Sequence, residues 1–166
     1  MRILGIDPGY AIVGWGVIDS DGNRSRAVAY GAITTPAEQV MASRLKDIYD
    51  GLIQVINEYK PDVVSMEELF FNSNAKTAIM VGQARGVLIL AVENSFLPLF
   101  EYTPLQVKQA IVGYGRADKN QVQQMVKVLL NLTAVPKPDD TADALGMALC
   151  HAHTYNFRVN QHINNK

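Results

Sequence analysis

The chain has 166 residues, of which 48% are hydrophobic and 19% charged, with a net charge of −1; this is the composition of a folded globular protein. It has no apolar run of about 18 residues and no apolar leader, so we expect neither a transmembrane helix nor secretion. The single Cys150 excludes an internal disulfide and a cysteine-based zinc site, and it is typical of the reducing cytoplasm. We expect one domain over residues 1–155 and a polar, frayed tail over residues 156–166.

The first third of the sequence predicts three strands joined by short turns. They cover residues 2–7, 13–18 and 26–33, with an Asp-Gly-Asn turn before the third. Short connections of this kind join antiparallel strands. Gly14 and Gly16 in the second strand indicate that another part of the backbone approaches closely there.

Helices alternate with two more strands in the rest of the chain. Apolar residues at helical spacing predict a helix from Pro36 to about Tyr59, and Val63–Glu67 is a short buried strand. The next predicted elements are a helix over residues 75–94, a strand over 97–102 and a helix over 104–112. Asp118 caps a further predicted helix, and the last predicted helix covers residues 141–153. The fold class is therefore α/β: a mixed five-stranded sheet, an antiparallel meander plus parallel strands, with helices on both faces.

Two acidic residues follow apolar strands directly. Asp7 ends the first strand, before Pro-Gly, and Glu67 ends the fourth. Ligands of such sheets gather beyond the carboxyl ends of the strands. Taken singly, each residue also fits a turn or a sheet edge. Together they indicate a shared site, because an uncompensated buried charge is costly.

Two more acidic residues lie at the start of the last predicted helix. Asp140 and Asp143 are three apart, which places them on one helix face, in the first turn where the helix dipole stabilises negative charge. With Asp7 and Glu67 they would form a set of hard oxygen ligands that suits Mg²⁺ or Mn²⁺ and, through the metal, phosphate chemistry.

Two of these four carboxylates, Glu67 and Asp140, have an acidic neighbour that could be the ligand instead. Strand alternation sends Glu67 and Glu68 to opposite faces of the sheet, so only one of them faces the site. Helix geometry separates Asp139 from Asp140 by about 100°. The residue pattern alone does not choose within either pair.

Basic residues gather in the middle of the chain. Residues 70–137 hold seven basic residues and three acidic ones. Two divalent cations on the four carboxylates would make the whole chain positive, so its net charge does not exclude a nucleic-acid partner. The loop Gly113–Lys119, with Tyr114 and Arg116, fits either a phosphate-holding loop or a simple mobile loop.

Two further features have alternative interpretations. Gly82 and Gly86 lie inside a predicted helix, where each costs about 1 kcal/mol relative to alanine. They indicate tight packing within the chain or close approach of another subunit or of nucleic acid. Phe70 follows the Glu67 strand and fits a core residue or, if exposed, a base-stacking residue.

An ordered set of segments, running from residue 2 to about residue 154, resembles the RuvC family of Holliday-junction resolvases. Asp-Pro-Gly after a strand is shared with related nuclease and ATPase folds, whereas the ordered set is specific. The segments are Gly5-Ile-Asp-Pro-Gly9, Met66-Glu67, Gly82-Gln-Ala-Arg-Gly86, Gln106-Val-Lys-Gln109, Gly113-Tyr-Gly-Arg116, Lys119-Asn-Gln-Val-Gln123 and Asp140-Thr-Ala-Asp-Ala-Leu145.

The resemblance implies an RNase H-like fold and a structure-specific endodeoxyribonuclease. Such an enzyme resolves Holliday junctions by symmetric, metal-dependent nicking of two strands during homologous recombination and DNA repair. The resemblance further implies a cytoplasmic homodimer, two Mg²⁺ ions per subunit with Mn²⁺ as a substitute, and a branch-migration motor complex as a partner.

The resemblance also assigns roles to residues. It makes Asp7, Glu67 rather than Glu68, Asp140 and Asp143 the catalytic, metal-binding carboxylates. Lys108 and Lys119 match basic residues that handle the DNA backbone, and Phe70 matches an aromatic residue that contacts bases. We add Arg116, from the basic loop, to the DNA-binding set.

Three other functions fit part of the pattern. An actin-like ATP-binding phosphotransferase needs two lobes, for which 166 residues are too few. An RNase H-like nuclease of ribosomal RNA maturation lacks the Gly82–Gly86 and Lys119–Gln123 segments. A non-catalytic module that binds DNA structures would share the basic residues but would not cleave.

Overall fold

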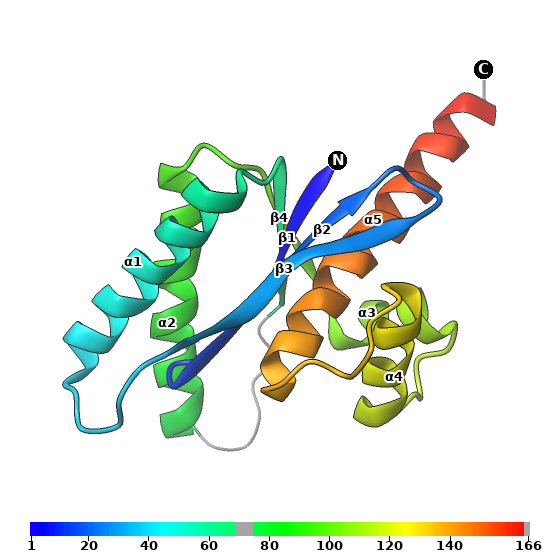
Figure 1. Ribbon diagram of the computed structural model, residues 1–166. Coiled ribbons are helices and arrows are strands. Elements are labelled where there is room, and N and C mark those ends of the chain that lie inside the picture. The colour runs from blue at the N-terminus through cyan, green and yellow to red at the C-terminus, as the bar shows by residue number, and fades with distance from the viewer. Residues whose placement is uncertain (69–74, 165–166) are drawn as a thin grey trace.

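The computed structural model describes residues 1–68 and 75–164, and Figure 1 shows a central sheet with helices on both sides. The elements are β1 (Arg2–Asp7), β2 (Ile12–Ser20), β3 (Ser25–Thr34), α1 (Met41–Tyr59), β4 (Val63–Glu67), α2 (Ala75–Asn94), β5 (Leu99–Tyr102), α3 (Pro104–Val112), α4 (Lys119–Leu129) and α5 (Asp139–Asn164). This is the predicted order of strands and helices. No helix in the described ranges is both long and apolar enough to cross a membrane.

The five strands form one mixed sheet in the order β3-β2-β1-β4-β5. β1 pairs antiparallel with β2, and β2 with β3, whereas β4 lies parallel to both β1 and β5. The prediction of an antiparallel meander plus parallel strands is confirmed. In the parallel pair Ile6 lies beside Met66, so the next residues, Asp7 and Glu67, leave the two strands side by side.

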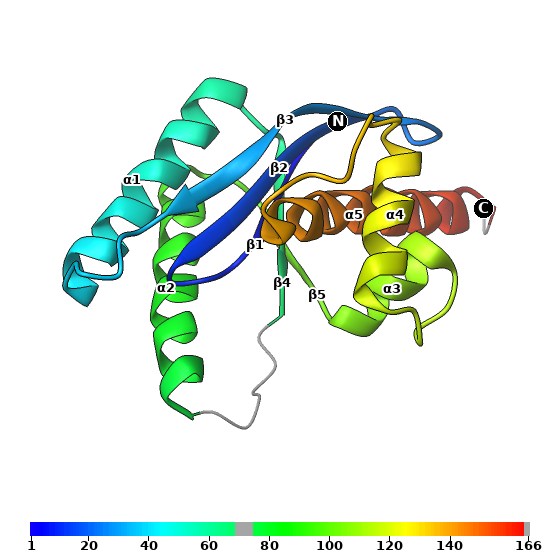
Figure 2. The same cartoon turned by 60° about the horizontal axis from the view of Figure 1, so that its bottom comes forward.

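Each face of the sheet has its own hydrophobic core. Helices α1 and α2 cover one face, and α5 covers the other with α3 and α4 beside it (Figure 2). Along β1, Leu4 and Ile6 belong to the core under α1 and α2, whereas Ile3 belongs to the core under α5. Strand alternation therefore points Asp7 toward the α5 face.

Glycines let α5 lie close against the sheet. A Cβ atom on Gly5 would stand 2.0 Å from the backbone oxygen of Ala144, and one on Gly14 would stand 2.0 Å from that of Asp140. The predicted close approach at Gly14 is thus confirmed, with α5 as the approaching element. Buried Thr141 fixes the first turn of α5 to the sheet, since its hydroxyl donates to the backbone oxygen of Gly31 at 3.1 Å.

Helix α1 begins later than predicted, at Met41 rather than at Pro36. The cause is Thr35, whose hydroxyl donates to the backbone oxygen of Tyr10 at 2.7 Å and accepts from Nε of buried Arg44 at 2.8 Å. With its hydroxyl engaged there, Thr35 cannot cap a helix at Pro36, and the chain makes a turn before α1.

Helix α5 continues to Asn164, so the predicted helix end near His153 is wrong. Figure 1 shows the last turns projecting beyond the sheet. The prediction relied on the polarity of this segment. Residues 154–164 contain neither proline nor glycine, and polar residues without a helix breaker do not end a helix.

Candidate active site

Two carboxylates stand at the ends of neighbouring parallel strands. Asp7 closes β1 and Glu67 closes β4, and both point toward the α5 face, because Met66 belongs to the opposite core and side chains alternate along a strand. Glu68 is exposed, and its backbone NH continues the pairing with β5 by donating to the oxygen of Tyr102 at 2.9 Å. The geometry therefore favours Glu67 over Glu68, a choice that the residue pattern left open.

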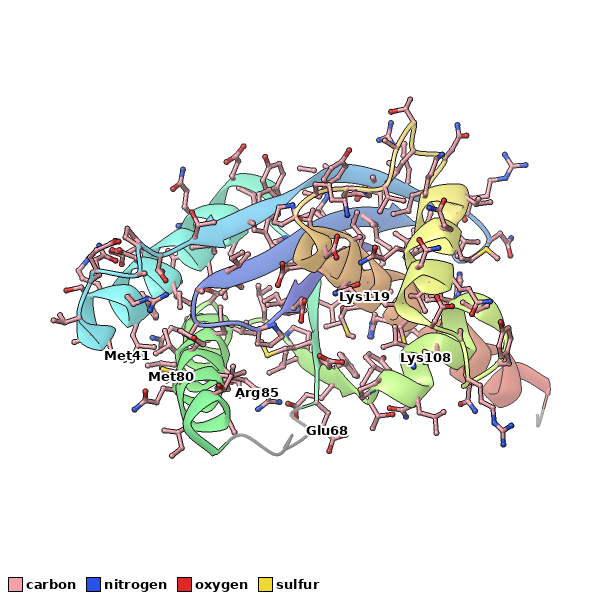
Figure 3. The ribbon with its side chains drawn as sticks, turned by 90° about the horizontal axis from the view of Figure 1, so that it is seen from below. Met41, Glu68, Met80, Arg85, Lys108 and Lys119 are labelled. Carbon is pink, nitrogen blue, oxygen red and sulfur yellow. The ribbon has the colours of Figure 1, made fainter. Side chains whose placement is uncertain are left out.

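These two carboxylates open into a cavity of about 180 Å³. Its acidic lining comes from β1, β4 and α5, its basic lining from α3 and α4, and its remaining wall is apolar. The lining residues are Asp7, Glu67, Pro104, Val107, Lys108, Lys119, Val122, Asp143 and Met147. Figure 3 shows the two lysines on the side of the molecule where α3, α4 and the first turns of α5 come together.

The carboxylates of the cluster are partly buried, and their negative charges act on one another. Burial raises the pKa of Asp7 to about 8, and the negative charges of Asp143, Glu67 and Asp140 add to the rise, while Lys119 opposes it. Burial also raises the pKa of Glu67, again helped by Asp143 and opposed by Lys119. The cluster thus carries more negative charge than its protein surroundings compensate.

Asp143 has a polar partner on each of its two carboxylate oxygens. Lys119 donates from Nζ to Oδ2 at 2.7 Å, and Gln123 donates from Nε2 to Oδ1 at 3.1 Å. Burial alone would lower the pKa of Lys119, but the hydrogen bond and charge of Asp143, with Asp139 and Asp7, raise it above its ordinary value. Lys119 is therefore held in its charged form at the mouth of the acidic cluster.

Asp140 lies close enough to raise the pKa of Asp7 by its charge, but it does not line the cavity. Its neighbour Asp139 pairs with Lys137 at 2.5 Å. The hydrogen bond and charge of Lys137, with the charge of Lys119, lower the pKa of Asp139, so this carboxylate already has a cationic partner. The geometry favours Asp140 over Asp139 as the member of the acidic cluster.

A divalent cation fits this donor set. Within residues 1–68 and 75–164, no three His, Cys, Asp or Glu side chains are already grouped as a metal cage. However, burial and the negative charges of Asp143, Glu67 and Asp140 raise the pKa of Asp7, and a bound cation would stabilise its ionised form. All the acidic donors are hard oxygens, as Mg²⁺ and Mn²⁺ prefer. The ammonium of Lys119 occupies one oxygen of Asp143, so a cation bound at that oxygen would compete with it.

The remaining predicted residues are placed differently. Lys108 is half-buried and lines the cavity, whereas Arg116 is exposed in the loop between α3 and α4 and does not line it. Phe70 lies outside the described residues.

Sequence reasoning missed two polar residues at the site. Gln123 could have been found, because it lies four residues after Lys119 and so shares its helix face. Arg85 of α2 donates from Nε to the backbone oxygen of Glu67 at 3.4 Å and pairs with Glu101 of β5. Figure 3 shows Arg85 near Glu68, at the end of β4. No sequence signal connects α2 to that strand end.

Comparison with known proteins agrees with this site. The sequence profile of the family described as crossover junction endodeoxyribonuclease RuvC matches residues 3–151. This chain belongs to the RuvC family. The RuvC of Alkaliphilus oremlandii is 64% identical over 157 residues, which cover 95% of this chain and 96% of that protein. The RuvC of Caldanaerobacter subterraneus is 58% identical and covers 95% of each chain.

Solved structures agree with the sequence comparison. A structure of Thermus thermophilus RuvC in complex with Holliday junction substrate superposes with a TM-score of 0.87 at 32% identity, over 95% of this chain and 96% of that one. A fowlpox virus resolvase, at 14% identity and a TM-score of 0.58, shares the fold. The predicted RNase H-like fold and the predicted membership among junction-specific DNA nucleases are confirmed.

Proposed function

We propose that this protein resolves four-way DNA junctions by nicking two strands symmetrically, in homologous recombination and DNA repair. The observation that carries the proposal is the cavity in which Asp7, Glu67 and Asp143 face Lys108 and Lys119. Carboxylates suit a divalent cation and lysines suit the phosphate backbone, so one cavity can hold both partners of metal-assisted phosphodiester hydrolysis.

The four carboxylates would hold two metal ions. Asp7 would be shared between them, with Glu67 as a ligand of one ion and Asp140 or Asp143 as a ligand of the other. We propose two Mg²⁺ ions per subunit, with Mn²⁺ as a substitute. Bound cations at such sites lower the pKa of a water nucleophile and stabilise charge on the leaving oxygen.

The basic residues would position the DNA. Lys119 reaches the acidic cluster and can offset charge that develops on the phosphate. Lys108, on the same cavity wall, would hold an adjacent backbone phosphate. Arg116, in its exposed loop, would extend the contact along the strand, and Phe70 would stack on bases near the junction centre.

We also propose a homodimer formed through α2. The first interpretation of Gly82 and Gly86, tight packing within the chain, lacks support, because no described atom lies within 4 Å of a Cβ added to either. Ile79 and Leu90 are 63% and 53% exposed and share that helix face. Two copies meeting there would bury this stripe and give two sites for symmetric nicking. A monomer in light scattering at micromolar concentration would contradict this assembly.

The remaining proposals concern the cellular setting. We propose that residues 1–155 act as a single nuclease domain in the cytoplasm and cooperate with a branch-migration motor complex. Support for this setting comes from family membership.

Paired substitutions test the carboxylate roles. Asp7→Asn should bind a synthetic four-way junction but lose Mg²⁺-dependent cleavage, because it removes the central ligand without changing shape. Asp140→Asn should also lose cleavage, while its neighbour Asp139→Asn, outside the cluster, should cleave normally. Near wild-type nicking by Asp7→Asn would show that the carboxylates do not hold the catalytic metal.

A further inference from the structure

Gln123 is a buried amide that reaches the acidic cluster from α4. It is 6% exposed, and its Nε2 donates to Oδ1 of Asp143 at 3.1 Å. Lys119, one helical turn earlier, donates to the other oxygen, Oδ2, at 2.7 Å. One face of α4 thus supplies a donor to each oxygen of Asp143.

The two donors differ in their freedom to move. The Lys119 side chain is 58% exposed, so it can swing toward solvent or a phosphate without disturbing the core. Gln123 is one of the buried residues of α4, together with Val122 and Val126, which belong to the hydrophobic core shared with α5. The capping box of Asp118 and Gln121 fixes the start of this helix. Gln123 therefore has much less room than Lys119 to leave Asp143.

The two donors also differ in charge. A lysine ammonium competes with a metal cation for the carboxylate, because both are positive. A neutral amide holds one carboxylate oxygen without repelling a cation at the other. Partners of this kind fix the orientation of metal ligands, and their removal typically costs about 10–100-fold in metal affinity or activity.

We propose that Gln123 is a positioning residue that holds Asp143 by Oδ1, and that Oδ2 is the oxygen that exchanges Lys119 for the divalent cation. Lys119, once released, is free to contact the phosphate. This inference rests on the proposed function, since it assumes that Asp143 is a metal ligand.

The test compares Gln123→Met with Gln124→Met. Methionine keeps the side-chain length but removes the amide donor, and Gln124 is an exposed residue one position along the same helix. Binding of Mn²⁺ to the DNA-free protein, measured by electron paramagnetic resonance, should weaken about 10–100-fold in Gln123→Met and remain unchanged in Gln124→Met. The Mg²⁺ concentration for half-maximal cleavage should rise by a similar factor, with junction binding in EDTA unchanged.

Lys119→Met supplies a second variant that does not disturb the core. Because it removes the cation that covers Oδ2, it should bind Mn²⁺ more tightly than the wild type while cleaving more slowly. Weaker or unchanged Mn²⁺ binding in this variant would overturn the exchange at Oδ2.

Three outcomes separate the possible failures. If Gln123→Met lowers the Tm but keeps its Mn²⁺ affinity within about twofold, Gln123 is only structural and the positioning role is wrong. If Asp143→Asn loses Mn²⁺ binding and cleavage while Gln123→Met keeps both, the inference fails and the proposed function stands. If Asp143→Asn binds Mn²⁺ and cleaves like the wild type, the inference fails, and if Asp7→Asn does so as well, the proposed function fails with it.

Discussion

Replacing Asp7 with asparagine should stabilise the metal-free protein while abolishing its response to metal. Burial and the neighbouring carboxylates raise the pKa of Asp7 from 3.8 to about 8. A carboxyl group with a raised folded-state pKa contributes its full stability only below its unfolded pKa. That stability is lost as the pH rises from about 4 through about 8. Asparagine keeps the shape of the side chain and removes the charge.

The size of the effect follows from the shift. At pH 7 Asp7 is ionised in the unfolded chain and mostly protonated in the folded protein. Because pH 7 lies about 3 units above the unfolded pKa, this protonation costs about 4 kcal/mol of folding free energy. Water entering the cavity and movement of Lys119 reduce this, so we expect about 2–4 kcal/mol. For a protein of this size that is a rise in Tm of about 5–10 °C.

Thermal unfolding of the wild type and Asp7→Asn in EDTA, at pH 5 and at pH 8, measures the stability that the variant gains. The advantage of the variant should be small at pH 5 and largest at pH 8, and Mg²⁺ should raise the Tm of the wild type alone. Asp47→Asn, on α1 and outside the cluster, controls for the loss of one carboxylate. A variant equally or less stable than wild type at both pH values would refute the electrostatic reasoning.

Four further predictions concern packing, dimerisation, protons and DNA. Gly5→Ala should destabilise the protein by at least about 3 kcal/mol in chemical denaturation, because its Cβ would meet a backbone oxygen of α5. Gly82→Ala, with open space at its Cβ, should raise helix stability by about 1 kcal/mol but weaken dimerisation in sedimentation; unchanged dimerisation would count against the α2 interface. Binding of Mg²⁺ at pH 7 should release about one proton, mainly from Asp7, seen as a buffer-dependent heat in calorimetry; a heat independent of the buffer would contradict the raised pKa. Lys108→Ala should weaken junction binding and reduce its salt slope by about 1; an unchanged slope would remove this lysine from the DNA contact.

Much of the site could be predicted because local rules place it. Asp7 and Glu67 end apolar strands, and the parallel pairing of β1 with β4 makes such ends adjacent. The spacing of Asp140 and Asp143 fixes their shared helix face before any tertiary contact is known. Asp118, predicted to cap the helix after it, does so, and it forms a full capping box with Gln121.

The parts that could not be predicted depend on contacts between distant segments. Helix α1 starts at Met41 because Thr35 bonds Tyr10 and Arg44, which are far apart in the sequence. The residue pattern did not choose between Glu67 and Glu68; the family resemblance assigned Glu67, and the physical reason lies in the pleat of β4 relative to α5. The role of Gln123 required the packing of α4 on α5, which sets which of its polar residues faces inward.

The most direct test of the central claim is cleavage of three DNA substrates by the purified protein. A synthetic four-way junction, a linear duplex and a single strand of the same sequence are incubated with Mg²⁺ or with EDTA. We expect paired, symmetric nicks in the junction alone, only with Mg²⁺, and none from Asp7→Asn. Cutting of all three substrates at similar rates, or no cutting of the junction despite tight binding, would contradict the assignment as a junction-resolving nuclease.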